Sequence, residues 1–494
     1  MRTKTIALII AAATGFAAAV PSRAAAAAAA TASEPLISVS DLRSDFAQMY
    51  QELQSAHFDL YAFTAKREMD RRFERMLGEI TRPSTRFEAK LRFELFVAAV
   101  RMGHARVESP TTEWRAFRKG GGRGFPLQIR IVDDRVYVAE NLSGMESIRP
   151  GAEIIAMRGL PMSRWLDRTE RRVSAETVYL AHSIMEYDFP IYLWAELGPV
   201  GSFDLIIRDQ AAHIRHLNVP ARTAEEMAAA QALQPAPLDL DNPLRESKIL
   251  EGNVAYLRPG PFYNADAKSG AQEWDVSGFK AFIDNAFQEF LRVGSNRLII
   301  DLRGNPGGDN LFSDTMISWF ATRPFRFASQ FKVKVSEQSI AANTARLAQD
   351  AEAAGPVSRE YAQLYAHSRI GEIVDFPIRE ALPREAGSFT GKVYVLIDRQ
   401  SYSNAVAVAA LVQDYGFGVI VGEATSDMAT TYGAMEQFSL THTGLLVGYP
   451  KARIVRPNGD LRSRGVTPDI AIPIPIVQSP QDPVLQQARA IALR

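Results

Sequence analysis

Cysteine is absent from this chain of 494 residues. Its absence excludes disulfide bonds, metal sites built on thiolates, a cysteine nucleophile and an N-terminal cysteine that carries a lipid. Lysine is also scarce, because only eleven of the 56 basic side chains are lysines and the others are arginines. Any catalytic role that requires a lysine therefore has few candidates in this sequence.

No charge of one sign predominates, because 56 basic residues balance 56 acidic ones. The chain therefore has no overall field that favours nucleic acid, an anionic membrane or an acidic substrate. Its apolar content of 47% and charged content of 23% are typical of a soluble protein. Its length suits about two to four domains. We expect no nucleic-acid partner and no stable membrane insertion of the mature chain.

Residues 1–30 have the pattern of a signal peptide followed by an alanine-rich tract. Arg2 and Lys4 form a basic start, and an apolar run follows from Ile6 to Val20. This run is short for a membrane span, and the alanines of 24–30 offer several A-x-A cleavage sites. We expect an exported protein, periplasmic or extracellular; a retained N-terminal anchor is the alternative.

One unit of the sequence predicts a strand, a polar turn, a buried helix and a second strand. Val393–Ile397 is β-branched and apolar, Ala405–Val412 holds only small and aliphatic side chains, and Val419–Val421 begins the second strand. The rest of the chain is organised around this unit.

Two serines, Ser401 and Ser403, lie at the start of the predicted helix. A helix start offers unpaired backbone N–H groups and the positive end of the dipole, so a hydroxyl there is suited to attack a carbonyl beside oxyanion donors. The alternative is that either serine only caps the helix.

The segment 35–115 is predicted to be helical. Ser40–Phe58 carries apolar side chains on one helical face, and a second helix starts at Pro83–Ser84. We expect Gly103 to stop this second helix, which places His104 just beyond its C-terminus. A histidine there is either a partner of the helix dipole or a functional group.

Short alternating strands follow at 127–131 and 136–139, and then a turn, a strand, a tight turn and a helix at 148–171. This order resembles the central part of a PDZ domain, whose strand and helix form a groove that captures a peptide by strand addition. We therefore expect a PDZ-like domain over 116–222 and a linker over 223–247.

The remaining residues, 248–494, are predicted to form an α/β domain. A strand at 254–257, an amphipathic helix at 276–293 and a strand at 298–302 alternate, which favours a largely parallel sheet. The glycine-rich turn that ends in Gly307–Gly308 matches neither the dinucleotide-binding motif nor the P-loop. We expect no nucleotide there, and neither a cofactor nor a metal in this protein.

Three separated motifs resemble the C-terminal processing, or tail-specific, peptidase family. They are DLRGNPGG at 301–308, SYSNA at 401–405 with QDYG and GEAT shortly after it, and GVTPDI at 465–470. The resemblance covers about residues 250–475 and extends weakly to the N-terminal helices. It implies an α/β fold with a crotonase/Clp-protease-like core, and hydrolysis of polypeptide substrates at unstructured or C-terminal segments.

The resemblance also implies roles for single residues. The QDYG motif aligns the nucleophile of the family with Ser403 rather than Ser401, and the N–H groups of Asn404 and of the Gly307–Gly308 turn then form the oxyanion hole. In the best-known members the base is a lysine, and its position falls on Met428, which accepts no proton.

Other relatives use a serine, a histidine and a glutamate, and His104 occupies the histidine position in its Gly-His context. A neutral imidazole is suited to take the proton of an alcohol near pH 7. The glutamate position falls on Arg462, which repels an imidazolium instead of orienting it. Asp460, two residues earlier, is the candidate substitute acid.

Two functions remain open at this point. The first is an exported serine endopeptidase, with Ser403 as nucleophile, His104 as general base and weakened support from an acid. The second is a catalytically weak or inactive protein that keeps the peptidase fold and binds peptides or an apolar ligand. Ser403, His104 and the glycine turn favour the first function, whereas Met428 and Arg462 favour the second.

Overall fold

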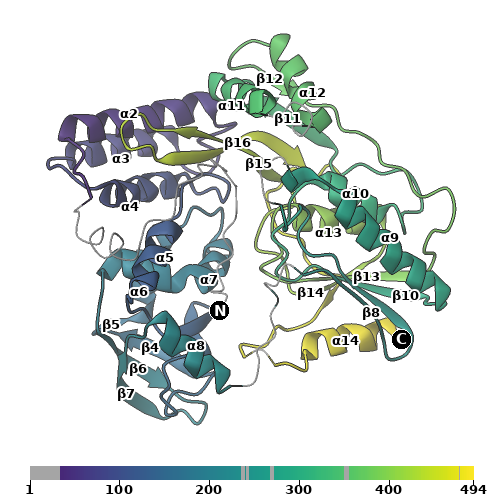
Figure 1. Cartoon of the computed structure of the whole chain (residues 1–494), viewed down its shortest axis with the longest axis horizontal. Coiled ribbons are helices and arrows are strands. Elements are labelled where there is room, and N and C mark those ends of the chain that lie inside the picture. The colour runs from purple at the N-terminus through teal and green to yellow at the C-terminus, as the bar shows by residue number, and fades with distance from the viewer. Residues whose placement is uncertain (1–33, 235–239, 241–243, 268–271, 350–354, 478) are drawn as a thin grey trace, which may run out of the picture.

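The computed structural model describes residues 34–494 except 235–239, 241–243, 268–271, 350–354 and 478. The predicted signal peptide and alanine-rich tract therefore lie outside the described residues, as does part of the predicted linker. Figure 1 shows the N-terminal helices and a small sheet on one side, and the C-terminal α/β part on the other.

The C-terminal part is built on the strands β8 (Glu246–Leu250), β9 (Val254–Arg258), β10 (Arg297–Asp301), β13 (Lys392–Ile397), β14 (Val419–Gly422) and β17 (Ile470–Ala471). They form a single sheet in the order β17-β14-β13-β10-β9-β8. All run parallel except the edge strand β8, which is antiparallel to β9. The predicted, largely parallel sheet is thus confirmed.

Both faces of this sheet are buried, because successive side chains of a strand point to opposite faces. Leu298 and Ile300 of β10 pack with three helices on one face, and Ile299 between them packs with α14 on the other. The helices are α9 (Ser277–Arg292), α10 (Asn310–Ile317) and α13 (Asn404–Tyr415) on the first face, and α14 (Pro483–Ala492) on the second.

A long antiparallel hairpin joins the C-terminal part to the N-terminal helices. Its strands are β15 (Thr431–Ser439) and β16 (Leu446–Val455); β16 also pairs with β1 (Arg106–Val107) and with β11 (Gln330–Lys334), which pairs with β12 (Ile373–Asp375). The hairpin lies beside α2 (Val39–Ala56), α3 (Lys66–Gly78) and α4 (Arg86–Val97) and shares one hydrophobic core with them (Figure 1). The predicted N-terminal segment therefore packs directly on the predicted peptidase core.

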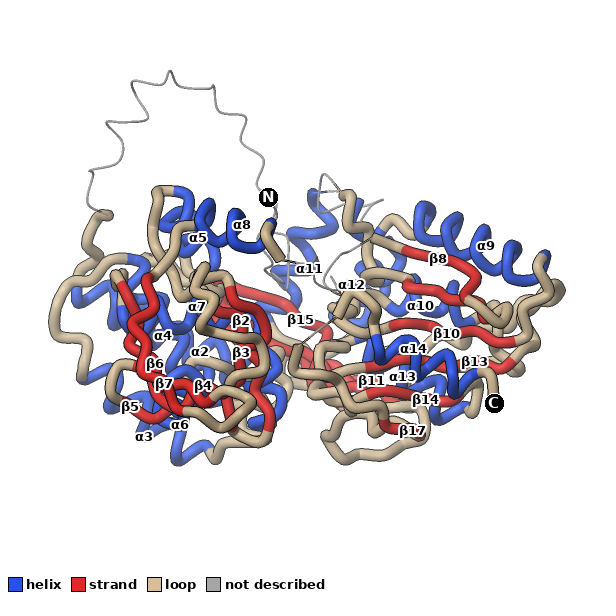
Figure 2. Tube along the Cα trace, turned by 90° about the horizontal axis from the view of Figure 1, so that it is seen from below, coloured by secondary structure: helices blue, strands red, loops and turns tan. Residues whose placement is uncertain are grey.

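Residues 125–221 enclose a hydrophobic core of their own. Their elements are β2 (Leu127–Val132), β3 (Arg135–Asn141), β4 (Glu153–Met157), β5 (Leu160–Pro161), α6 (Met162–Glu170), α7 (Val178–Leu197), β6 (Ser202–Arg208) and β7 (Ile214–Pro220). The sheet β2-β3-β4-β6-β7 packs with α6 and α7, and Figure 2 shows it opposite the parallel sheet. The strand, turn and helix predicted at 148–171 are β4, β5 and α6, but the 20-residue helix α7 was not predicted.

Four further helices flank these parts. They are α5 (Thr111–Lys119), α8 (Ala224–Ala232), α11 (Glu337–Gln349) and α12 (Gly355–Ala366). The helix α8 lies within the segment 223–247 that was predicted to be a linker.

The prediction that Gly103 ends the second helix is wrong. The α-helix α4 ends at Val97, and Arg101 takes the left-handed conformation with a φ of 59°. Gly103 instead lies close to other segments, because a Cβ atom there would be 3.3 Å from the Tyr402 hydroxyl and 3.4 Å from a carboxylate oxygen of Glu176.

The buried His57 leads to a prediction about stability at low pH. Its Nδ1 atom accepts the Asp59 N–H (3.1 Å), and the Lys334 ammonium donates to its carbonyl (2.9 Å). Burial, and secondly Lys334, lowers the pKa of His57 to about 3. The unfolded chain, with a histidine pKa of about 6.5, therefore takes up a proton that the folded protein refuses.

We expect His57→Asn to remove this acid sensitivity, because the amide oxygen of asparagine still accepts the Asp59 N–H. As the pH falls from 7 to 4.5, the free energy of unfolding, measured in urea, should decrease more steeply for the wild type than for His57→Asn. The two slopes should differ by about 1.4 kcal/mol per pH unit. Parallel curves for the two proteins would contradict the assignment.

Candidate active site

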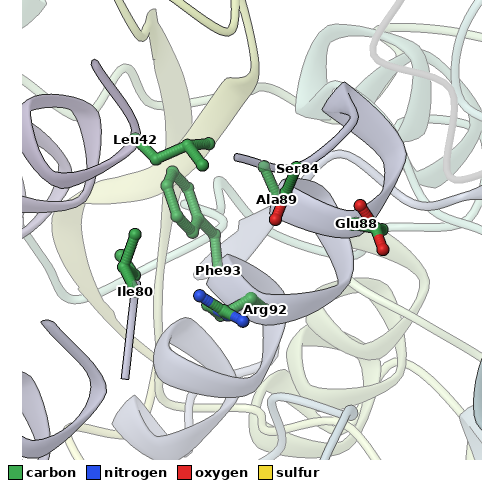
Figure 3. Close-up of a pocket in the computed structure, with 7 residues that line it drawn as sticks. All are labelled: Leu42, Ile80, Ser84, Glu88, Ala89, Arg92 and Phe93. Atoms are coloured by element: carbon green, nitrogen blue, oxygen red, sulfur yellow. The ribbon is translucent and has the colours of Figure 1, made fainter. Parts of the chain in front are cut away.

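A small cavity between the N-terminal helices is not suited to a substrate (Figure 3). Its volume is about 10 Å³, the room that one water molecule needs. It is lined by Leu42, Ile80, Ser84, Glu88, Ala89, Arg92 and Phe93.

Among the described residues, no cluster of acidic and histidine side chains is placed to hold a metal ion. In the same part of the chain, no helix combines the length and apolar character needed to cross a bilayer.

Two loops meet where neighbouring strands of the parallel sheet end. Because β10 and β13 are parallel and adjacent, the glycine turn after β10 and the serine turn after β13 leave the sheet at the same edge. The Tyr402 N–H donates to the Asn305 carbonyl (2.9 Å), and the Asn305 side chain accepts the Gly307 N–H (2.8 Å). Two of the three predicted motifs are therefore parts of one site.

Ser401 has a structural position. Its side chain is fully buried, and its hydroxyl donates to the Leu302 carbonyl (2.8 Å) and accepts the Asp398 N–H (3.1 Å). The Asp398 carboxylate in turn accepts the N–H groups of Gln400 and Ser401, which closes the turn. A hydroxyl held in this way is not available to attack a substrate.

Ser403 has a different environment. It is half-buried at the N-terminus of α13, in a strained conformation with a φ of 52° and a ψ of −120°. Its hydroxyl makes no capping hydrogen bond and has no partner in the part of the chain that the structure describes. A strained turn between a strand and a helix is typical of exposed nucleophilic serines.

Backbone N–H groups without an acceptor lie next to Ser403. Within the described ranges, neither the Asn404 N–H nor the Gly308 N–H has an internal partner. Gly307 brings their two loops into contact, because a Cβ atom there would lie 2.6 Å from the Asn404 nitrogen and 2.8 Å from the Ser403 Cβ. Two such donors are suited to the oxyanion of a tetrahedral intermediate.

His104 lies beside the same loops. Its ring stacks on that of Tyr402, with 5.3 Å between the centroids. In the sequence, Tyr402 lies 299 positions after Gly103, the residue directly before His104. His104 therefore contacts the residue that directly precedes Ser403. Burial, and secondly Arg106, lowers the pKa of His104 to about 3, so the ring is neutral near pH 7.

The loop that carries His104 is held by the segment before α7. The Met102 N–H donates to the Ser174 hydroxyl (3.0 Å), which donates back to the Met102 carbonyl (2.7 Å). The Gly103 N–H donates to a carboxylate oxygen of Glu176 (3.1 Å). The position of the histidine thus depends on the domain predicted to be PDZ-like.

Two buried carboxyl groups, Asp427 and Glu176, were not predicted at this site. Asp427 accepts the Ser403 N–H (2.6 Å). Burial raises the pKa of Asp427 to about 6; burial, and secondly Asp427, raises the pKa of Glu176 to about 7. No sequence pattern marks Glu176, and the one clue to Asp427 is that it precedes Met428, the buried residue at the lysine position.

The GVTPDI motif holds the loop that carries Asp427. The Val466 N–H donates to the Thr425 hydroxyl (2.9 Å), the Thr425 N–H donates to the Val466 carbonyl (3.1 Å), and the Ala429 N–H donates to the Arg464 carbonyl (2.9 Å). The third motif therefore supports the loop that carries Asp427.

Asp460 is not brought to His104. Its carboxylate forms ion pairs with Arg462 and Arg464, both at 2.9 Å, which hold the pKa of Asp460 well below its usual range. Arg462 is exposed and is turned toward Asp460. The carboxylate of the candidate acid is therefore paired with Arg462 and Arg464, two and four residues away in its own loop.

A network of four charged side chains, three of them buried and Glu423 partly buried, joins α7 to the loops at this edge. Arg399 binds Glu186 of α7 (2.9 Å) and Glu423 of the GEAT motif (2.7 Å). Arg130 of β2 binds the same two carboxylates, at 3.0 and 3.2 Å. Charges paired in this way are costly to separate, so the network fixes the predicted PDZ-like domain against the serine turn.

Comparisons with known proteins agree with this architecture. The model of peptidase family S41 matches residues 255–472. No curated protein sequence gives a significant match.

Among solved structures, mature CPAF complexed with lactacystin has a TM-score of 0.62 at 16% identity, covering 92% of this chain and 97% of that chain. Mature CPAF alone has a TM-score of 0.61 at 16% identity, with 92% and 96% covered. A serine-to-alanine mutant of CPAF has a TM-score of 0.62 at 15% identity, with the same coverage. The chain therefore has the fold of CPAF over most of its length, with a segment that matches peptidase family S41.

Proposed function

We propose that this protein is an exported serine endopeptidase that cleaves polypeptides at unstructured or C-terminal segments. The observation that carries the proposal is Ser403, whose free hydroxyl lies on a strained turn beside the unpaired N–H groups of Asn404 and Gly308. The match to a peptidase family over residues 255–472 and the fold shared with CPAF support a serine peptidase. The signal-peptide pattern of residues 1–30 supports export.

The reaction follows from the placement of these groups. The Ser403 oxygen attacks the carbonyl carbon of a peptide bond while His104 takes the hydroxyl proton. The Asn404 and Gly308 N–H groups stabilise the oxyanion, and His104 gives its proton to the amine as the C–N bond breaks. Water, deprotonated by His104, then attacks the acyl carbon, and His104 gives this proton to the Ser403 oxygen as the ester bond breaks.

A binding protein with the peptidase fold is the second candidate function. It is favoured by Met428 at the lysine position and by the low pKa of His104, because a buried ring that resists protonation is a weak base. Such a protein would hold a peptide or an apolar ligand without cleaving it.

A fluorophosphonate probe separates the two functions. We expect the mature wild-type protein to form a covalent adduct with loss of fluoride, and peptide mass spectrometry should place the adduct on Ser403. Absence of an adduct, or an adduct on Ser401 instead, would contradict the proposed nucleophile. Heat-denatured protein is the control for nonspecific labelling.

A further inference from the structure

Three buried polar atoms without hydrogen-bond partners belong to this one site. Within the described part of the chain, the His104 Nδ1, the Glu176 Oε1 and the Asp427 Oδ1 atoms are all sealed from solvent and lack a partner. A buried polar atom without a partner destabilises the folded protein, so such groups are rare unless they serve a function. Asp427 accepts the Ser403 N–H, and Glu176 accepts the N–H of Gly103, which directly precedes His104.

Glu176 is built into the loop that carries His104. Its Oε2 atom accepts the N–H of Gly103, the residue directly before His104 (3.1 Å), and its side chain is 6% exposed. The other carboxylate oxygen, Oε1, is therefore the one that remains available. The Tyr402 hydroxyl, on the ring that stacks on His104, donates to the Gly103 carbonyl (3.4 Å), so the same short segment touches all of these groups.

We propose that Glu176 is the carboxylate partner of His104, accepting a hydrogen bond from Nδ1–H when His104 takes the Ser403 proton. The proton stays on the imidazole, and Glu176 orients the ring and balances its positive charge. This proposal rests on the proposed function. It gives to the segment before α7 the role that Arg462 and Asp460 do not fill, because Asp460 is bound by two arginines.

Asp427 adds to the effect of burial on Glu176. Burial, and secondly the nearby carboxylate of Asp427, raises the pKa of Glu176 to about 7. The other groups that face His104 and Glu176 are Arg106, Tyr402 and Arg101. None of these three supplies a carboxylate. Reactivity should therefore rise with pH between about 6 and 8, as Glu176 ionises.

The test compares the rate of fluorophosphonate labelling between pH 5.5 and 9 for four proteins: wild type, Glu176→Gln, Glu176→Asp and Asp460→Asn. We expect Glu176→Gln to slow labelling by about 10²- to 10⁴-fold and to lose the rise with pH. Glu176→Asp should restore part of both, and Asp460→Asn, the matched acid-to-amide control, should equal the wild type. A wild-type rate and pH profile in Glu176→Gln would overturn the proposal.

A second measurement tests whether Glu176 pairs with His104 even if the protein does not react with the fluorophosphonate probe. The ¹⁵N chemical shifts of the His104 ring, assigned by comparison with His104→Ala, report which nitrogen carries the proton. We expect the tautomer signal of the wild type to change between pH 6 and 8 and that of Glu176→Gln to stay constant. If Glu176→Gln does not fold, Glu176→Asp replaces it. The pH midpoint of the change in the His104 ring signal should then differ from that of the wild type.

The outcomes separate the two proposals. Identical His104 signals in wild type and variant would overturn the role of Glu176, whereas an unreactive wild type whose His104 responds to Glu176 would overturn only the peptidase function. Thermal unfolding of each variant shows whether a lost rate reflects lost folding.

Discussion

Ser403→Ala is expected to reduce peptide hydrolysis by about 10⁶-fold. The hydroxyl that this change removes has no structural partner among the described residues, so the fold and its stability should be preserved. The measurement is kcat/KM on one unstructured polypeptide, together with the melting temperature of each protein.

Ser401→Ala is the matched control, because the same atom is removed two residues away. The Ser401 hydroxyl donates to the Leu302 carbonyl (2.8 Å) and accepts the Asp398 N–H (3.1 Å) in a fully buried position. Its loss should cost about 1–3 kcal/mol of folding free energy while most of the activity remains. Equal losses of activity in the two variants would mean that neither hydroxyl is the nucleophile.

Gly307→Ala is expected to reduce labelling and hydrolysis by about 10³-fold or more. The added Cβ would lie 2.6 Å from both the Asn404 nitrogen and the Tyr402 carbonyl oxygen, closer than any real contact, and Gly307 has a φ of 87°. Because these neighbours are backbone atoms, the serine turn itself must move. The oxyanion donors and the nucleophile would then separate.

Gly371→Ala serves as the control for the backbone conformation alone. Gly371 has a φ of 86°, but a Cβ there would meet nothing within 4 Å. The strain of about 1–2 kcal/mol for an L-residue in this conformation should therefore appear in both variants, and the loss of activity only in Gly307→Ala. Similar rates in the two variants would show that the contact between the loops is not required for catalysis.

Local pattern was enough to predict much of the fold. The apolar run of β13, the small side chains of α13 and the glycine turn after β10 are contiguous signals, and they correctly predict a largely parallel sheet. Such elements depend on residues that are near in sequence, where periodicity and turn chemistry act directly. The helix α7 was not predicted, because its composition is mostly apolar and its apolar residues follow no clear helical period.

Local pattern failed after α4, where Arg101 and Gly103 are alternative positions for the end of the helix. Gly103 is a good helix stop by type, yet Arg101 takes the left-handed conformation that ends the turn after α4. A Cβ atom at this glycine would instead lie 3.3 Å from the Tyr402 hydroxyl and 3.4 Å from a carboxylate oxygen of Glu176. These two residues come from distant parts of the chain, and no windowed pattern contains them.

The environment of each candidate group is a property of tertiary packing. By their position at the predicted helix start alone, Ser401 and Ser403 are equivalent, but Leu302 of the neighbouring loop binds only the first. Glu176 is joined to the loop of His104 by the Gly103 N–H, and the GVTPDI motif holds the loop that carries Asp427. Hydrogen bonds and burial between segments about 70 to 300 residues apart follow from how the layers pack, which local propensity does not encode.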